Sequence, residues 1–171
     1  QQLKSLITAL EVDVVSTHEL PEAYAKDFPW VKFHLRPTKE KLRQLYSKQS
    51  AWIFSSREEG FGLPLLESLA CGTPVFAFEA GAAKDVLNHN LLGKVIPNHS
   101  VERMVDALAE QLLGSLRNSI DVTHACREQA LRWSWAHSFK AFEAVLQDIR
   151  DKNKLLLSPK VYPSATSLMR A

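Results

Sequence analysis

The stretch F-S-S-R-E-E-G-F-G-L-P-L-L-E-S-L-A-C-G-T-P-V-F-A, residues 54–77, places a glycine-rich loop between a buried strand and a helix. Gly60 and Gly62 carry no side chains, so a ligand can approach the loop backbone. Pro64 suits the first turn of the helix that follows. Because backbone N–H groups at a helix N-terminus favour anions, the loop predicts a site for a phosphate or diphosphate. Its position after a strand is where α/β sheets bind their ligands.

The segments around this loop indicate alternating strands and helices. Ala51–Phe54 and Val75–Phe78 are continuous apolar runs, as expected of parallel strands that are covered on both faces. Pro21 and Pro29 predict a loop between Thr17 and Trp30, with at most one helical turn. Strands separated by helices are typical of βαβ units, so the sequence predicts the α/β class. Further strands are expected at 11–16, 31–35 and 94–96, and helices at 1–10, 64–71, 84–88, 100–113 and 122–150. Another helix is expected to start at residues 37–38, with Thr38 as its N-cap and Leu42, Leu45 and Tyr46 on one face. Ser134 is the expected cap of the last helix.

The composition is that of a soluble globular protein. The chain has 171 residues, of which 46% are hydrophobic and 23% charged, with a formal net charge of +2. We expect one domain at 1–150 and a weakly packed tail at 151–171. Basic residues form no dense run, which argues against nucleic acid and membrane surfaces as partners. The chain has neither a long apolar stretch nor a signal-peptide pattern, so a cytoplasmic location and no transmembrane segment are expected.

Two carboxylates near the loop are candidates for binding hydroxyl groups. Glu59 lies in the loop itself, and Glu67 falls about one turn into an otherwise apolar helix. A carboxylate among apolar neighbours needs a partner, and ligand hydroxyls would serve. Cys71 and Cys126 are not spaced as metal ligands, so reduced structural thiols are the expectation. The glycine loop alone is explained equally well as a tight turn.

The run E-G-F-G-L-P-L-L-E-S-L-A-C-G-T-P-V, residues 59–75, resembles the E-x7-E signature of retaining glycosyltransferases of family 4. These enzymes have the GT-B fold of two Rossmann-like domains. The following F-E-A-G-A-A-K-D-V-L is similar to the family's Gly-Gly-x-x-Glu turn, with Gly81 in place, Ala82 for the second glycine and Asp85 for the glutamate. Segments 92–97 and 133–139 are similar to the family's closing segments, so the resemblance covers roughly residues 1–150.

The resemblance implies a site for a nucleoside-diphosphate sugar. Glu67 would hold the ribose hydroxyls, and Glu59 would hold hydroxyls of the donor sugar in the catalytic position. Backbone amides in the loop would bind the sugar or the diphosphate. The strand end at Leu35 and Arg36, which lacks the family's usual glycine, would contact the base through backbone atoms. The implied residues are therefore Glu59 as catalytic, with Glu67, Gly60, Phe61, Gly62, Leu63, Leu35 and Arg36 as donor-binding.

The resemblance also implies what lies outside this chain. Family members neutralise the diphosphate with an Arg and a Lys just after the first strand of this domain, and they bind the acceptor on a separate N-terminal domain. The chain starts after that point, so it resembles a C-terminal donor-binding domain without its first strand. The full enzyme would be a retaining hexosyltransferase that uses a UDP-, GDP- or ADP-sugar and needs no metal, and the chain alone would be inactive.

Two other interpretations stay open at this point. The first is a non-catalytic interaction module that keeps the fold, with its motif carboxylates as remnants. The second is a GT-B epimerase or phosphorylase, which shares the donor pocket but not the reaction. The products of the full-length protein would distinguish the second alternative from a glycosyltransferase.

Overall fold

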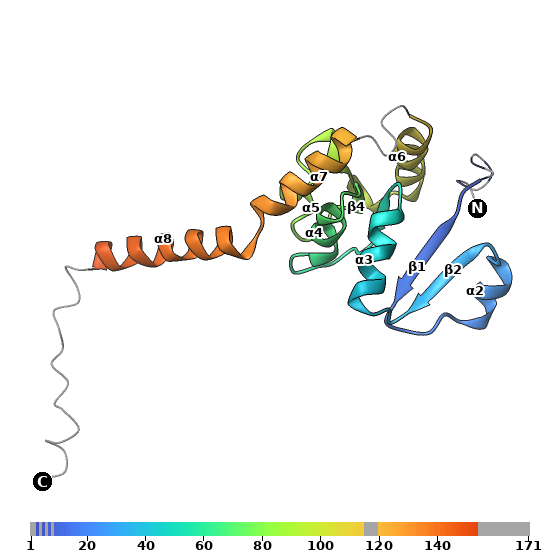
Figure 1. Ribbon diagram of the computed structural model, residues 1–171, viewed down its shortest axis with the longest axis horizontal. Helices are drawn as coiled ribbons and strands as arrows, with labels where there is room; N and C mark the ends of the chain where they lie inside the picture. Colours follow the sequence, from blue (N-terminus) through green and yellow to red (C-terminus); the bar gives the residue numbers. More distant parts are fainter. Residues whose placement is uncertain (1–2, 4, 6, 8, 115–119, 154–171) are drawn as a thin grey trace, which may run out of the picture. The chain divides into compact units, whose positions relative to one another are not determined.

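The computed structural model describes residues 3, 5, 7, 9–114 and 120–153 (Figure 1). The chain divides into two compact units, residues 1–132 and residues 133–171. Of the expected tail at 151–171, only residues 151–153 fall within the described part of the chain. The helix expected at 1–10 is described only in part, and there Leu3 packs against the core of the first unit.

The described strands of the first unit form two parallel sheets. One pairs β1 (Val12–Ser16) with β2 (Val31–Leu35), with Val12 opposite Val31 and Ser16 opposite Leu35. The other has the order β3 (Trp52–Phe54), β4 (Val75–Phe78) and β5 (Gly93–Ile96). All four residues of the middle strand β4 are buried, as its continuous apolar run predicted. The parallel pairing and the helices between strands confirm the expected Rossmann-like α/β class.

Along the chain, helices alternate with the strands of the first unit, and two of the described α-helices begin at side-chain caps. Thr38 is the N-cap of α3 (Lys39–Lys48), as predicted, because its hydroxyl accepts a hydrogen bond of 3.2 Å from the Lys41 N–H. Ser100 caps α6 (Val101–Leu113) in the same way, through the Arg103 N–H at 3.2 Å. The helices of the first unit are α2 (Glu22–Asp27), α3 (Lys39–Lys48), α4 (Leu63–Ala70), α5 (Ala83–Val86), α6 (Val101–Leu113) and α7 (Ile120–Arg132), with short 3₁₀ turns at Asn90–Leu92 and Pro97–His99.

The segment between β1 and β2 differs from the prediction. It was expected to be a loop with at most one helical turn, but it contains the six-residue helix α2. Pro21 occupies the N-cap position and Pro29 follows the helix end at Phe28, so neither proline interrupts a helical hydrogen bond. Glu22 in the first turn and Lys26 in the last turn also suit the helix dipole.

The core of the first unit holds the site-bearing elements in place. Phe76 and Phe78 of β4 pack with Met104 and Leu108 of α6. On α4, Leu65 and Leu69 are completely buried, and this helix makes its main packing contact with α7. Helix α4 also contacts β3 and β4, so packing fixes this helix relative to the sheet.

The second unit contains α8 (Trp135–Asn153). Ser134 precedes this helix as predicted, and its hydroxyl lies 2.9 Å from His137 Nδ1. The helix carries an apolar stripe whose side chains are exposed, from 63% at Phe139 to 49% at Ile149. Among the helices of the described residues, none is long and apolar enough to cross a membrane.

Candidate functional site

The glycine-rich loop joins the carboxyl end of β3 to the N-terminus of α4. Gly62 has φ +93°, a left-handed conformation that turns the chain from the loop into the helix. A Cβ at this position would lie 3.2 Å from Leu65 and 3.3 Å from the Phe54 ring, so the loop also passes close to the core. The backbone amides that start α4 are thereby presented at the carboxyl edge of the sheet, where a helix N-terminus favours anions.

A second loop closes against the first. The Ala82 N–H donates a hydrogen bond of 3.0 Å to the Phe61 carbonyl oxygen. Gly81 has φ +52°, and a Cβ added there would lie 2.6 Å from the same oxygen and 3.1 Å from Glu59 Cβ. The loops after β3 and β4 are therefore in backbone contact, and the exposed Glu59 lies beside the Gly81 turn. At Gly60, by contrast, an added Cβ would meet nothing within 4 Å, so this part of the loop is open.

Glu67 has a partner within the chain. The Tyr46 hydroxyl on α3 donates a hydrogen bond of 3.0 Å to Glu67 Oε2. Tyr46 is only 3% exposed, and its ring packs on Trp52 with 4.4 Å between ring centroids. Burial raises the pKa of Tyr46 far above its usual value, and the Glu67 charge adds to this, so the hydroxyl stays protonated. The sequence predicts that this carboxylate needs a partner, but no local pattern in it identifies Tyr46 as that partner.

Buried hydrogen bonds connect Tyr46 to the turn before β4. The Thr73 hydroxyl donates to the Tyr46 carbonyl oxygen at 2.7 Å, and the Ser68 hydroxyl donates to the Thr73 carbonyl oxygen at 3.1 Å. Both side chains are buried. The end of α3, the middle of α4 and the start of β4 thus form one connected region around Glu67.

The residues expected at the base, Leu35 and Arg36, lie at the carboxyl end of β2 on the other sheet. The Arg36 N–H donates to the Ser16 carbonyl oxygen at 2.8 Å, and Arg36 Nε donates to the Thr17 carbonyl oxygen at 2.8 Å. Arg36 has φ +44°, so the strand end keeps a conformation that favours glycine although an arginine occupies it. These contacts tie Leu35 and Arg36 to β1, and they do not join them to the loop that carries Glu59.

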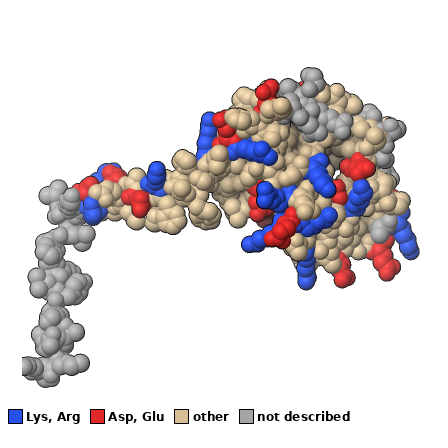
Figure 2. All heavy atoms as spheres, in the orientation of Figure 1, with Lys and Arg blue, Asp and Glu red and all other residues tan. Residues whose placement is uncertain are grey.

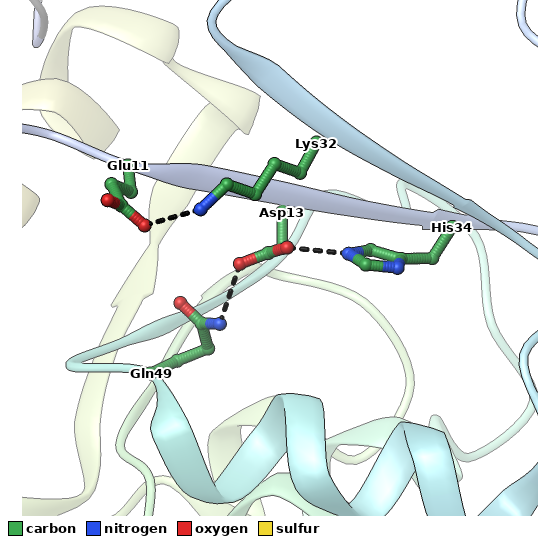
Figure 3. Close-up of polar contacts among 5 residues, drawn as sticks. All are labelled: Glu11, Asp13, Lys32, His34 and Gln49. Atoms are coloured by element: carbon green, nitrogen blue, oxygen red, sulfur yellow. Dashed lines mark hydrogen bonds and ion pairs between the residues drawn. The ribbon is translucent and has the colours of Figure 1, made fainter.

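A second polar cluster lies on the face of the β1–β2 sheet (Figure 3). One oxygen of Asp13 lies 2.5 Å from His34 Nε2, and the other accepts a hydrogen bond of 2.9 Å from Gln49 Nε2. The neighbouring pair of Glu11 and Lys32 is 2.7 Å apart and exposed. Since both Asp13 oxygens are engaged by the protein, this cluster is suited to joining β1 to the segment before β3 rather than to holding a ligand.

Neither cysteine belongs to a site in the described part of the chain. Cys71 and Cys126 are free thiols, as expected. Burial raises the pKa of Cys126 to about 12, which leaves it protonated and unreactive. Over the described residues, no group of three or more His, Cys, Asp or Glu side chains is placed to hold a metal ion.

The first unit is a Rossmann-like α/β domain with a glycine-rich loop and two acidic residues near the N-terminus of a helix. Residues 29–133 match the family model described as "Glycosyl transferases group 1". This match covers more than half of the chain, so the chain belongs to that family, and the family resemblance found in the sequence is confirmed.

Curated relatives agree with this assignment. The chain is 33% identical over 99 residues to D-inositol 3-phosphate glycosyltransferase of Mycobacteroides abscessus, covering 58% of this chain and 22% of that protein. It is 38% identical over 78 residues to GDP-mannose-dependent alpha-(1-6)-phosphatidylinositol monomannoside mannosyltransferase of Mycobacterium tuberculosis, covering 45% of this chain and 20% of that protein. The chain thus spans about a fifth of the length of these relatives.

A solved structure supports the fold. Sucrose-phosphate synthase from Thermosynechococcus elongatus aligns with a TM-score of 0.71 at 20% identity, covering 88% of this chain and 41% of that protein. At this identity the similarity shows the shared architecture, and the family match carries the assignment.

Proposed function

We propose that this chain binds a nucleoside-diphosphate sugar at the loop before α4 and that it forms the donor-binding part of a retaining hexosyltransferase. One observation carries the proposal: the loop with Glu59 is held in backbone contact with the Gly81 turn, directly before the helix that presents Glu67. The chain's family membership gives this arrangement its chemical meaning.

Each residue of the arrangement has a proposed role. Glu67 accepts hydrogen bonds from the ribose hydroxyls, and Glu59 accepts hydrogen bonds from hydroxyls of the donor sugar. The diphosphate approaches the amides of residues 61–63 and the N-terminus of α4, which stabilise the charge that develops as it departs. No metal is required in this scheme. Leu35 and Arg36 contact the base through their backbone, which requires the two sheets to face a common cleft.

We further propose that a strand outside this chain lies between the two sheets. β1 pairs only with β2, and β3 pairs only with β4, so within the described residues each keeps one unpaired edge. Ile53 in the middle of β3 is 45% exposed, which is unusual for an apolar residue of a parallel sheet. A parallel strand between these edges would pair both and cover Ile53. The loop following that strand would supply the cationic side chains for the diphosphate.

The test is a binding screen with UDP, GDP and ADP by calorimetry or ligand-observed NMR. The name of the Mycobacterium tuberculosis relative makes GDP the first nucleotide to try. One nucleotide is expected to bind selectively, and Glu67→Gln is expected to weaken it because a neutral amide is a poorer partner for two hydroxyls. Glu58→Gln is the matched control, since Glu58 is an adjacent exposed carboxylate outside the E-x7-E pattern. Equal binding by both variants would contradict the proposal.

Two alternative functions predict different outcomes. In a non-catalytic interaction module, Glu59→Gln and Glu67→Gln would leave the activity of the full-length protein unchanged. In an epimerase or phosphorylase, the product would be an epimerised sugar or a free sugar phosphate instead of a glycoside.

The proposed partners are a nucleotide sugar and an acceptor-binding domain, and not nucleic acid. On the face shown in Figure 2, acidic and basic side chains are interspersed, which is the pattern of a solvated surface. A cytoplasmic location is part of the proposal, and cell fractionation of the full-length protein tests it.

A further inference from the structure

The Glu67 carboxylate is held by one of its two oxygens. Tyr46 occupies Oε2, at 3.0 Å, while Oε1 has no protein partner within the described residues. An ionised carboxylate has about four acceptor positions, so one bound hydroxyl leaves about three, enough for two ribose hydroxyls. A glutamate side chain near the surface has several rotamers of similar energy. The contact with Tyr46 therefore selects one of them.

Tyr46 is itself held by packing. The residue is 3% exposed, and its ring packs on Trp52 with 4.4 Å between ring centroids. A hydroxyl fixed in this way is a rigid donor. Hydrogen bonds to an ionised acceptor are also stronger than neutral ones, so Tyr46 is well suited to orient a carboxylate.

We infer that Tyr46 is a positioning residue, which holds Glu67 so that Oε1 is presented to the ribose hydroxyls of the nucleotide. This inference rests on the proposed function. Tyr46 does not touch the nucleotide, and its effect passes entirely through the Glu67 carboxylate. Without the hydroxyl, Glu67 would sample other rotamers and would have to be ordered again when the nucleotide binds.

Tyr46→Phe tests this inference, because it removes the hydroxyl and keeps the ring that packs on Trp52. The probes are the selected nucleoside diphosphate and its 2′,3′-dideoxy form, measured by calorimetry on the full-length protein. Loss of the fixed orientation is expected to weaken binding of the ribonucleotide by about threefold to tenfold, the scale of one hydrogen bond. Binding of the dideoxy nucleotide, which has no hydroxyls for Glu67, is expected to stay the same.

Thr73→Val is the matched structural control. It removes the hydrogen bond to the Tyr46 carbonyl oxygen in the same buried region but leaves the Tyr46 hydroxyl in place. It is expected to lower the melting temperature and to leave the affinity ratio of ribonucleotide to dideoxy nucleotide unchanged. In a Glu67→Gln background, Tyr46→Phe is expected to have little further effect on that ratio.

The possible results separate this inference from the proposed function. If Glu67→Gln weakens the ribonucleotide and Tyr46→Phe does not, the positioning role is wrong and the proposed function stands. If Tyr46→Phe weakens both nucleotides equally, or if Thr73→Val changes the ratio as much, Tyr46 acts only through the fold. If binding does not depend on Glu67 at all, both proposals fail.

Discussion

Asp13 is a half-buried carboxylate whose two oxygens contact His34 and Gln49. Burial by itself raises its pKa, but the hydrogen bonds with His34 and Gln49, together with the charges of His34 and Lys32, outweigh burial and lower the pKa below 3.8. Because the folded-state pKa of Asp13 is lower than its unfolded-state pKa, Asp13 stabilises the protein at pH values above the unfolded-state pKa. The contribution is then lost as the pH falls through the folded-state pKa.

We therefore predict that Asp13→Asn removes part of the acid sensitivity of the protein. At neutral pH the variant should be less stable by about 1–2 kcal/mol, because it loses charge-assisted contacts. Below about pH 4 the difference from the original protein should shrink, as the Asp13 contribution disappears from the latter. Urea unfolding between pH 3 and 7 measures this. Glu11→Gln removes the exposed pair with Lys32 and should change stability by much less.

The residues of the site differ in how well the sequence predicts them. The E-x7-E spacing is local, so it identifies Glu59 and Glu67 directly. Tyr46 is 21 positions from Glu67, and it shares an apolar helix face with Leu42 and Leu45. A buried tyrosine hydroxyl usually has a partner, but the sequence does not say which one. Long-range contacts of this kind depend on how α3 and α4 pack.

At the scale of elements, the contact between the loops after β3 and β4 depends on Gly81. We predict that Gly81→Ala destabilises the first unit by about 1–3 kcal/mol, because the new Cβ meets a backbone oxygen and the left-handed conformation strains an alanine. Gly60→Ala, in the facing loop, should change stability by less than about 0.5 kcal/mol, since its Cβ meets nothing within 4 Å. Thermal denaturation of the two variants compares them, and equal melting temperatures would contradict this account of the loop contact.

Helix α3 carries Tyr46, so the stability of this helix, including its N-cap Thr38, affects the site around Glu67. Thr38→Ala removes the acceptor for the Lys41 N–H and should lower the free energy of unfolding by about 1 kcal/mol. Thr38→Ser keeps the hydroxyl and should retain most of this stability. Chemical denaturation of both variants provides the measurement, and a serine variant as unstable as the alanine variant would exclude capping as the reason.

Element boundaries show where sequence patterns succeed and fail. Continuous apolar runs predicted both β3 and β4, but only β4 is buried along its whole length, whereas Ile53 of β3 is 45% exposed. The prolines at 21 and 29 predicted a loop with at most one helical turn, yet they flank the six-residue helix α2 without entering it. A proline at either side of a short helix costs no hydrogen bond, so only the precise position of each proline distinguishes a loop from a helix.

At the scale of the whole molecule, the sequence predicts the class of fold but not the separation of its sheets. Apolar runs and helix patterns report the burial and periodicity of each element. They do not report which strand lies beside which, because the order of strands in a sheet depends on contacts between residues far apart in the chain. The sequence pattern therefore does not show that β1 and β3 each keep an unpaired edge within the described residues. The resemblance to a family supplied the expectation of a missing strand, and the unpaired edges of β1 and β3 are compatible with it.

These unpaired edges lead to a last prediction. The 171-residue chain should not transfer sugar by itself, because the proposed scheme places the acceptor site and the cationic part of the diphosphate site outside it. A longer form of the protein that adds the proposed strand and its loop should bind the nucleotide more tightly and protect the amides of β1 and β3 from hydrogen exchange. Sugar transfer and hydrogen exchange are measured side by side on both forms. Sustained transfer by the short chain would refute the division of the site, whereas unchanged exchange at β1 and β3 in the longer form would refute the inserted strand.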